Sequence, residues 1–154
     1  MFMKPKKNFI RLNLYKKIID NVPIVGVDII VEYKNGILLI KRSEEPKKDV
    51  WWFPGGRVLK YETPGKAAVR ITKKETGLSS RVKNFVGVYT TTFERWKGIK
   101  HFSIHLVHHV VANGNVLIDE TSSDYKIVNK IQKNMHPYMK KALKDSRVFS
   151  KDTN

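Results

Sequence analysis

Glu75 is the residue in this sequence whose charge most needs a partner. It lies in the stretch RITKKETGL. At about 100° per residue, a helix here would place Glu75 on one face with Ala68, Ile71 and Thr72. An uncompensated carboxylate on a buried face costs several kcal/mol, so Glu75 needs a cation. That cation is either an arginine or Mg²⁺, which takes one or two protein carboxylates together with phosphate oxygens.

A glycine pair upstream of Glu75 is the second candidate for chemistry. Gly55 and Gly56 precede Arg57. Glycines let the backbone approach a ligand closely, and an arginine beside them can bind phosphate through charge-assisted hydrogen bonds. A simple tight turn is the alternative. Glu62 follows in the same loop, either as a solvated acid or as a partner for a nearby arginine.

Strands must position these residues. Residues 24–33 (IVGVDIIVEY) are rich in β-branched side chains, and the turn at Lys34-Asn35-Gly36 leads into a second strand over 37–42, which predicts a hairpin. Residues 87–93 and 102–112 are also expected to be strands, joined by a polar excursion over 94–100. Together they predict a mixed sheet.

Three helices are expected around that sheet. Residues 9–20 have apolar side chains at helical spacing. The central helix begins with a Thr63 cap and Pro64 at its first position, and Gly77 closes it. A further helix is predicted over 129–144. The fold class is therefore α+β, with a mixed sheet sandwiched between helices. We expect one domain over 1–154, with an N-terminal helical segment at 1–22 and a frayed tail at 146–154.

Charge dominates the composition. The chain of 154 residues has 30 Lys plus Arg against 14 acids, a net charge of +16 and a pI near 10.0. Such a surface attracts polyanions, which favours phosphorylated ligands or nucleic acid, although lysine-rich surfaces also serve solubility alone. There is no cysteine and no apolar run of membrane-spanning length, so thiol chemistry is excluded and a soluble, cytoplasmic protein without a membrane partner is expected.

The segment GGRVLKYETPGKAAVRITKKETGL resembles the Nudix box, G-x5-E-x7-R-E-U-x-E-E-x-G-U, where U is aliphatic. Two glutamates of the common pattern are replaced by Ile71 and Lys74, and Thr72 replaces an aliphatic residue. These departures themselves resemble the altered box of GDP-mannose mannosyl hydrolases, G-x5-E-x7-R-L-T-x-x-E-L-G. The matched positions are Gly56, Glu62, Arg70, Glu75, Gly77 and Leu78.

The resemblance covers most of residues 20–128 and implies a set of functional residues. Members of that family cleave the sugar C–O bond at the anomeric carbon with the help of Mg²⁺; Mn²⁺ is a possible substitute. Glu75 and the Gly55 carbonyl would bind the metal, and the substrate would be linked to a nucleoside diphosphate. A homodimer is also implied. The remaining implied roles are substrate or leaving-group contacts for Asp28, Arg42 and Arg57, and catalytic or structural support from Glu62 and Arg70.

The water-activating residue of that family is not matched. Where the family has Gln-His after Asp-Glu, this chain has Thr121-Ser122, neither of which titrates near neutrality. His101, His105 and His109 share one strand face, which is more typical of a half-exposed sheet than of a base. His136 is kept as a candidate base.

Three functions follow as hypotheses. The first is a Mg²⁺-dependent hydrolase of a nucleotide sugar such as GDP-mannose. The second is a pyrophosphohydrolase of a nucleoside triphosphate or ADP-ribose. The third, from a different class, is a catalytically weak module that binds nucleotide or, less favoured, RNA. The released product distinguishes the first two.

Overall fold

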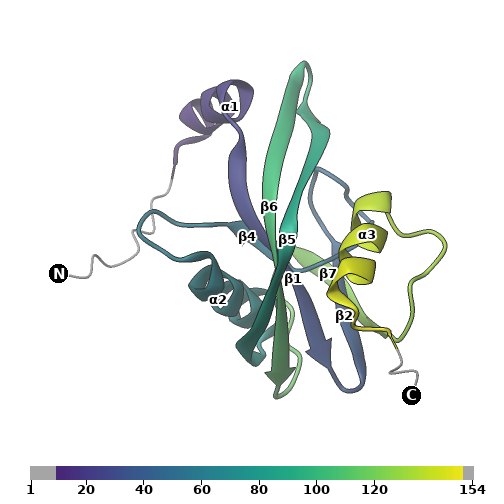
Figure 1. The fold of residues 1–154 in the computed structure, drawn as a ribbon. Helices are drawn as coiled ribbons and strands as arrows, with labels where there is room; N and C mark the ends of the chain where they lie inside the picture. Colours follow the sequence, from purple (N-terminus) through teal and green to yellow (C-terminus); the bar gives the residue numbers. More distant parts are fainter. Residues whose placement is uncertain (1–9, 151–154) are drawn as a thin grey trace.

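A mixed sheet runs through the centre of the computed structural model, which describes residues 10–150 (Figure 1). Its main path has the order β3-β2-β1-β6-β5, with β4 paired to β1 and β7 paired to β2. The elements are α1 (Leu12–Asn21), β1 (Ile24–Tyr33), β2 (Gly36–Arg42), β3 (Trp51–Trp52), β4 (Gly55–Arg57), α2 (Pro64–Thr76), β5 (Ser79–Trp96), β6 (Ile99–Asn113), β7 (Ser122–Val128) and α3 (Pro137–Ser146).

The hairpin between β1 and β2 confirms the predicted turn. Lys34 and Asn35 both have positive φ, 47° and 63°, and Tyr33 pairs with Gly36 across the turn. Two successive positive φ values match the twist of adjacent strands, which is why Asn-Gly turns favour hairpins. A side chain at position 36 would collide with Ile127 of β7, so the glycine also admits that strand.

The second hairpin is longer than predicted. β5 begins at Ser79 and continues to Trp96, and the turn is at Lys97-Gly98 rather than over 94–100. Gly98 has a φ of 76°, which suits a tight turn. The charged pair Glu94-Arg95 lies between Phe93 and Trp96 inside β5, so the polar composition after Phe93 does not mark a loop.

β7 was not predicted from the sequence. It runs antiparallel to β2, with Leu38 opposite Ile127. The segment SSDYKIV has only two β-branched residues and starts with polar ones, so its strand conformation depends on the free edge of β2 beside it.

The central helix α2 forms as predicted. The Thr63 hydroxyl accepts a hydrogen bond from the Lys66 amide at 3.3 Å, and Gly77 ends the helix with a φ of 73°. Its buried face comprises Ala67, Ala68, Ile71, Thr72, Glu75 and Thr76.

The C-terminal helix differs from the prediction. Residues 129–136 are not helical, and α3 begins at Pro137, with the His136 side chain accepting from the Tyr138 amide at 3.2 Å. Proline disfavours helix in the residue before it, which explains the late start. The tail expected to fray from Ser146 packs in part, because Val148 and Phe149 contact the core; residues 151–154 lie outside the described range.

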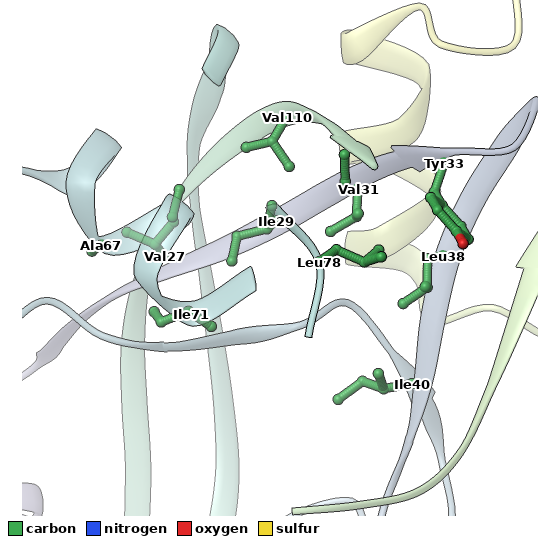
Figure 2. Close-up of a cluster of buried hydrophobic side chains, with 12 residues drawn as sticks. Val27, Ile29, Val31, Tyr33, Leu38, Ile40, Ala67, Ile71, Leu78 and Val110 are labelled. Atoms are coloured by element: carbon green, nitrogen blue, oxygen red, sulfur yellow. The ribbon is translucent and has the colours of Figure 1, made fainter. Parts of the chain in front are cut away.

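Two hydrophobic clusters hold these layers together, one on each side of the sheet. The first joins β1 to α2, with Val27 and Ile29 against Ala67 and Ile71 (Figure 2). The second joins the other face to α3, including Met139. The sheet is thus sandwiched between helices, as predicted. Within residues 10–150, none of the helices has the length and apolar character needed to cross a membrane.

Candidate functional site

A cavity of about 290 Å³ opens between α1, the sheet and the glycine loop. Its wall combines three kinds of side chain. Asp28 and His105 lie among the lining residues from β1 and β6. The cationic lining residues are Arg42, Lys47, Arg57 and Arg95, and the aromatic ones are Tyr15, Trp52 and Phe93. Such a wall suits an anionic ligand that also carries a flat ring.

Asp28 is the buried carboxylate of this cavity, 5% exposed. Its Oδ2 accepts hydrogen bonds from the Tyr138 hydroxyl at 2.8 Å and the Trp52 Nε1–H at 3.3 Å, and His105 Nδ1 lies 3.2 Å away. Its Oδ1 adjoins Gly55, where an added Cβ would come within 2.1 Å of it. Position 55 therefore requires glycine because this carboxylate occupies the space.

Glu75 lies behind the glycine loop and is 9% exposed. Its Oε2 accepts a hydrogen bond from the Gly55 amide at 3.0 Å. Burial raises the pKa of Glu75 to about 8, with Asp119 and Asp28 adding to the rise and the Gly55 amide and Arg42 opposing it. A carboxylate in this position is short of a cation, as the sequence predicted.

The positive charge that Glu75 lacks is better supplied by a hydrated divalent cation than by one held entirely by protein ligands. Among residues 10–150 no three carboxylate or imidazole groups gather as a metal site. Oδ2 of Asp119 is buried without a hydrogen-bond partner, and the Asp119 amide contacts the Glu75 carbonyl at 3.4 Å. Mg²⁺ tolerates a site with few protein oxygens, in which water and phosphate supply the remaining ligands.

The departures from the common box are visible in α2. Ile71 is buried in the core beneath the sheet and Lys74 is exposed. The two positions that would hold extra glutamates therefore supply no carboxylate, and Glu75 is the one box glutamate left on α2.

Glu62 and Arg70 form a structural clamp rather than part of the cavity wall. Arg70 donates to both Glu62 oxygens, at 2.6 and 3.0 Å, and to the Arg57 carbonyl at 3.0 Å. The Leu59 amide donates to Glu62 as well. Burial raises the pKa of Glu62, but these hydrogen bonds outweigh it and the net shift is downward. The clamp fixes the loop that carries the glycine pair.

The predicted substrate arginines do line the cavity. Arg57 lies over the Tyr15 ring, 5.0 Å from its centroid, and Arg42 donates to the Pro46 carbonyl at 2.8 Å. Arg95 was not assigned a site role from the sequence, yet its guanidinium also lies over the Tyr15 ring, 5.2 Å from the ring centroid. The mixture of aromatic and cationic side chains over residues 93–97 is the sequence signal that could have found it.

His136 lies beside the cavity but is not among its lining residues. Its ring contacts Trp52 and Phe93, with centroids 5.3 and 5.7 Å apart, and its Nδ1 caps α3. Burial and Lys47 lower its pKa. The structure gives this histidine a helix-capping role.

His105 is the residue that sequence reasoning set aside. Alternation placed it correctly on one strand face, but that face is not half-exposed at this point, because Tyr138 of α3 stacks on the imidazole with centroids 5.0 Å apart. The histidine lies between Asp28 and the hydroxyl of Thr91. No local pattern could reveal this, since the three residues come from three strands.

The positions of the unmatched Gln-His pair hold no base. Ser122 is 7% exposed in β7, opposite Arg42, and its hydroxyl has no partner among the described residues. Thr121 donates to the Asp119 carboxylate.

Comparison with known proteins places this geometry in a family. The NUDIX domain model matches residues 22–144. The chain is 30% identical over 133 residues to the low-salt glycan biosynthesis protein Agl8 of Haloferax volcanii, covering 84% of this chain and 85% of that protein. It is 49% identical over 69 residues to an ADP-ribose pyrophosphatase of Methanocaldococcus jannaschii, covering 45% and 41%.

Solved structures agree on the fold. The MutT protein of Methanosarcina mazei Go1 superimposes with a TM-score of 0.67 at 21% identity, covering 85% of this chain and 99% of that one. The NUDIX domain of Shewanella oneidensis NrtR, solved with ADP-ribose, gives 0.55 at 16% identity, covering 77% and 82%. With the domain match, the altered box and the sandwiched sheet together, the chain belongs to the NUDIX family of hydrolases.

Proposed function

We propose that this protein hydrolyses a nucleoside diphosphate-linked sugar, such as GDP-mannose, with Mg²⁺ or Mn²⁺ as cofactor. The observation that carries the proposal is the cavity whose wall combines Asp28 and Gly55 with four cationic side chains, while Glu75 behind the wall accepts a hydrogen bond from the Gly55 amide. A diphosphate needs cations along its length, and a sugar beyond it needs a carboxylate for its hydroxyl groups or for positive charge at the anomeric carbon.

Each lining group has a place in this proposal. Arg42 and Arg57 would bind the diphosphate, and Tyr15 with Phe93 would contact the base. Glu75 and Gly55 would hold the metal, which supplies charge neutralisation to the departing diphosphate. The clamp of Glu62 and Arg70 would keep the loop in register without touching substrate.

Two further observations favour a nucleotide sugar. The departures at Ile71 and Lys74 leave one box carboxylate on α2, Glu75, which suits stabilisation of a leaving diphosphate. The relative that aligns over most of the chain is named for glycan biosynthesis. Sugar transfer to water would then release free sugar and a nucleoside diphosphate.

Pyrophosphohydrolysis of ADP-ribose is the second candidate. It is favoured by the 49% identity to the archaeal ADP-ribose pyrophosphatase over 69 residues. In that reaction the P–O bond breaks, and the products are two monophosphates.

Hydrolysis in ¹⁸O-labelled water separates the two. The protein is incubated with Mg²⁺ and a panel containing GDP-mannose, other nucleotide sugars, ADP-ribose and nucleoside triphosphates, and products are identified by mass spectrometry. We expect ¹⁸O in free sugar and none in phosphate. Label in a monophosphate contradicts C–O cleavage and supports the second candidate. Tight binding of GDP without any product would show a binding module instead.

A homodimer in the cytoplasm belongs to the same proposal and is tested by light scattering and cell fractionation.

A further inference from the structure

A hydroxyl, an imidazole and a carboxylate form a continuous row on the cavity wall. Thr91 Oγ1 lies 2.7 Å from His105 Nε2, and His105 Nδ1 lies 3.2 Å from Asp28 Oδ2. All three residues line the cavity. Thr91 is 7% and Asp28 5% exposed, so the two ends of the row are held away from bulk solvent.

The sheet fixes the row. Thr91 of β5 and His105 of β6 lie on one face of an antiparallel pair in which Tyr89 is opposite His105, and β1 runs parallel on the other side of β6. Tyr138 covers the imidazole with an interplanar angle of 23° and donates to Asp28. Both ring nitrogens are therefore assigned a partner, and the ring cannot rotate freely.

We propose that Thr91, His105 and Asp28 activate the attacking water, replacing the base that is missing at Thr121-Ser122. This inference rests on the proposed hydrolase function. An imidazole hydrogen-bonded to a hydroxyl on one side and a carboxylate on the other is a recurrent arrangement for proton removal.

The row passes one proton from water to the imidazole through the Thr91 hydroxyl. Water gives a proton to Thr91 Oγ1 while the Thr91 hydroxyl proton passes to His105 Nε2, so one O–H bond breaks in the water and one N–H bond forms on the ring. The water oxygen forms its new bond to the electrophilic carbon or phosphorus as the leaving oxygen departs with its electron pair. Asp28 stabilises the imidazolium, whose proton returns to solvent or to the leaving diphosphate.

The groups facing His105 determine the sign of its pH dependence. They are Asp28 on β1, Tyr138 on α3 and His101 on its own strand, with Arg42 and Arg95 on the same cavity wall. Burial lowers the pKa of His105, but Asp28 outweighs burial and the net shift is upward. Because a base must be neutral to accept a proton, turnover rises with pH through this pKa.

A second histidine pair provides an internal control. His109 Nε2 lies 2.7 Å from Glu32 Oε2, between the same two strands, β6 and β1. This pair is not among the cavity-lining residues. Removing it tests what loss of a histidine–carboxylate contact does to the sheet alone.

The test compares kcat and KM against pH for Thr91→Val, Thr91→Ser and His105→Gln, with His109→Gln and Thr92→Val as controls. The substrate is whichever panel member the parent hydrolyses fastest.

Loss of a positioned base removes about 10² to 10⁴ in rate. We expect that loss in kcat for Thr91→Val and His105→Gln, with little change in KM. In both variants the fall of kcat toward acidic pH, the acidic limb of the pH profile, should disappear. Thr91→Ser retains the hydroxyl and should restore most of the rate. Controls should keep the parent profile.

A parent-like kcat and acidic limb in Thr91→Val, folded by thermal melting, overturns the proposal even if His105→Gln unfolds. The imidazole tautomer, read from ¹⁵N NMR, is an independent measurement. The row requires Nδ1–H with Nε2 as acceptor, so a neutral ring protonated at Nε2 also overturns it. A parent inert toward the whole panel refutes the proposed function instead, and the tautomer then decides the row alone.

Discussion

Glu75 shows how one residue couples stability to metal binding. Its carboxyl has a pKa of about 8 in the folded protein because it is buried, against an ordinary value of 4.5. Between these values folding takes up a proton, so the stability contributed by this group is present at low pH and is lost as pH rises. A bound cation would reverse that loss, since it displaces the proton and pairs with the carboxylate.

We predict that Glu75→Gln flattens this dependence. The metal-free variant should melt above the parent at pH about 9 and near it at about 5, because Gln cannot ionise. Mg²⁺ should raise the parent's melting temperature, more at higher pH, and leave the variant unchanged. Thermal melts with and without Mg²⁺ measure both effects, with the exposed Glu94→Gln as control. If Mg²⁺ still stabilises the variant, Glu75 is not a ligand of the metal.

Arg57 is the second residue whose role is open to a direct measurement. Its guanidinium lies over the Tyr15 ring on the cavity wall and is not part of the Glu62–Arg70 clamp. We predict that Arg57→Ala weakens GDP binding by about 1.5 to 3 kcal/mol, roughly 10- to 150-fold, because a charge-assisted contact is lost. Calorimetry with GDP checks it. The exposed Arg81→Ala on β5 should bind as the parent does, and equal affinities in both variants would contradict the assignment.

At the level of elements, the loop between β4 and α2 is positioned by a clamp rather than by its own conformation. Glu62 has a side chain only 2% exposed and accepts from Arg70 and from the Leu59 amide, while Arg70 reaches the carbonyl of Arg57. The end of β4 at Arg57 and the loop residues Leu59 and Glu62 are thereby tied to α2. The glycine pair can approach a ligand only while these contacts hold.

We predict that Glu62→Ala destabilises the protein by about 1 to 3 kcal/mol, because it leaves the partly buried donors of Arg70 and Leu59 without their acceptor. Lys83→Ala, which removes the exposed pair with Glu32, should cost under about 1 kcal/mol. Urea unfolding of both variants measures the difference. If Glu62→Ala is as stable as Lys83→Ala, the clamp contributes nothing to the fold.

At the scale of the whole molecule, the net charge of +16 is the dominant property. Four of the cations, Arg42, Lys47, Arg57 and Arg95, line the cavity. A field of this sign raises the encounter rate of anionic ligands and decays within about 10 Å at 0.1 M salt. Charge of this kind accelerates capture without selecting among phosphorylated ligands.

We predict that the association rate of a fluorescent GDP analogue falls by about tenfold or more between ~0.01 M and ~0.15 M NaCl, since steering is screened over that range. Stopped-flow fluorescence measures the rate. Binding of the uncharged nucleoside guanosine should hardly respond to salt. A GDP rate independent of salt would show that the surface charge serves solubility alone.

Local patterns alone determined the hairpin at Asn35 and the limits and buried face of α2. These features depend on turn conformations, helix caps and spacing along one element, all of which the chain encodes within a few residues. The tertiary structure decided the rest. β7 is a strand because the edge of β2 is free, α3 starts at Pro137 and makes His136 a cap, and Thr91, His105 and Asp28 meet because β5, β6 and β1 are neighbours. Contacts between strands far apart in sequence have no local signature, since each strand shows only its own alternation.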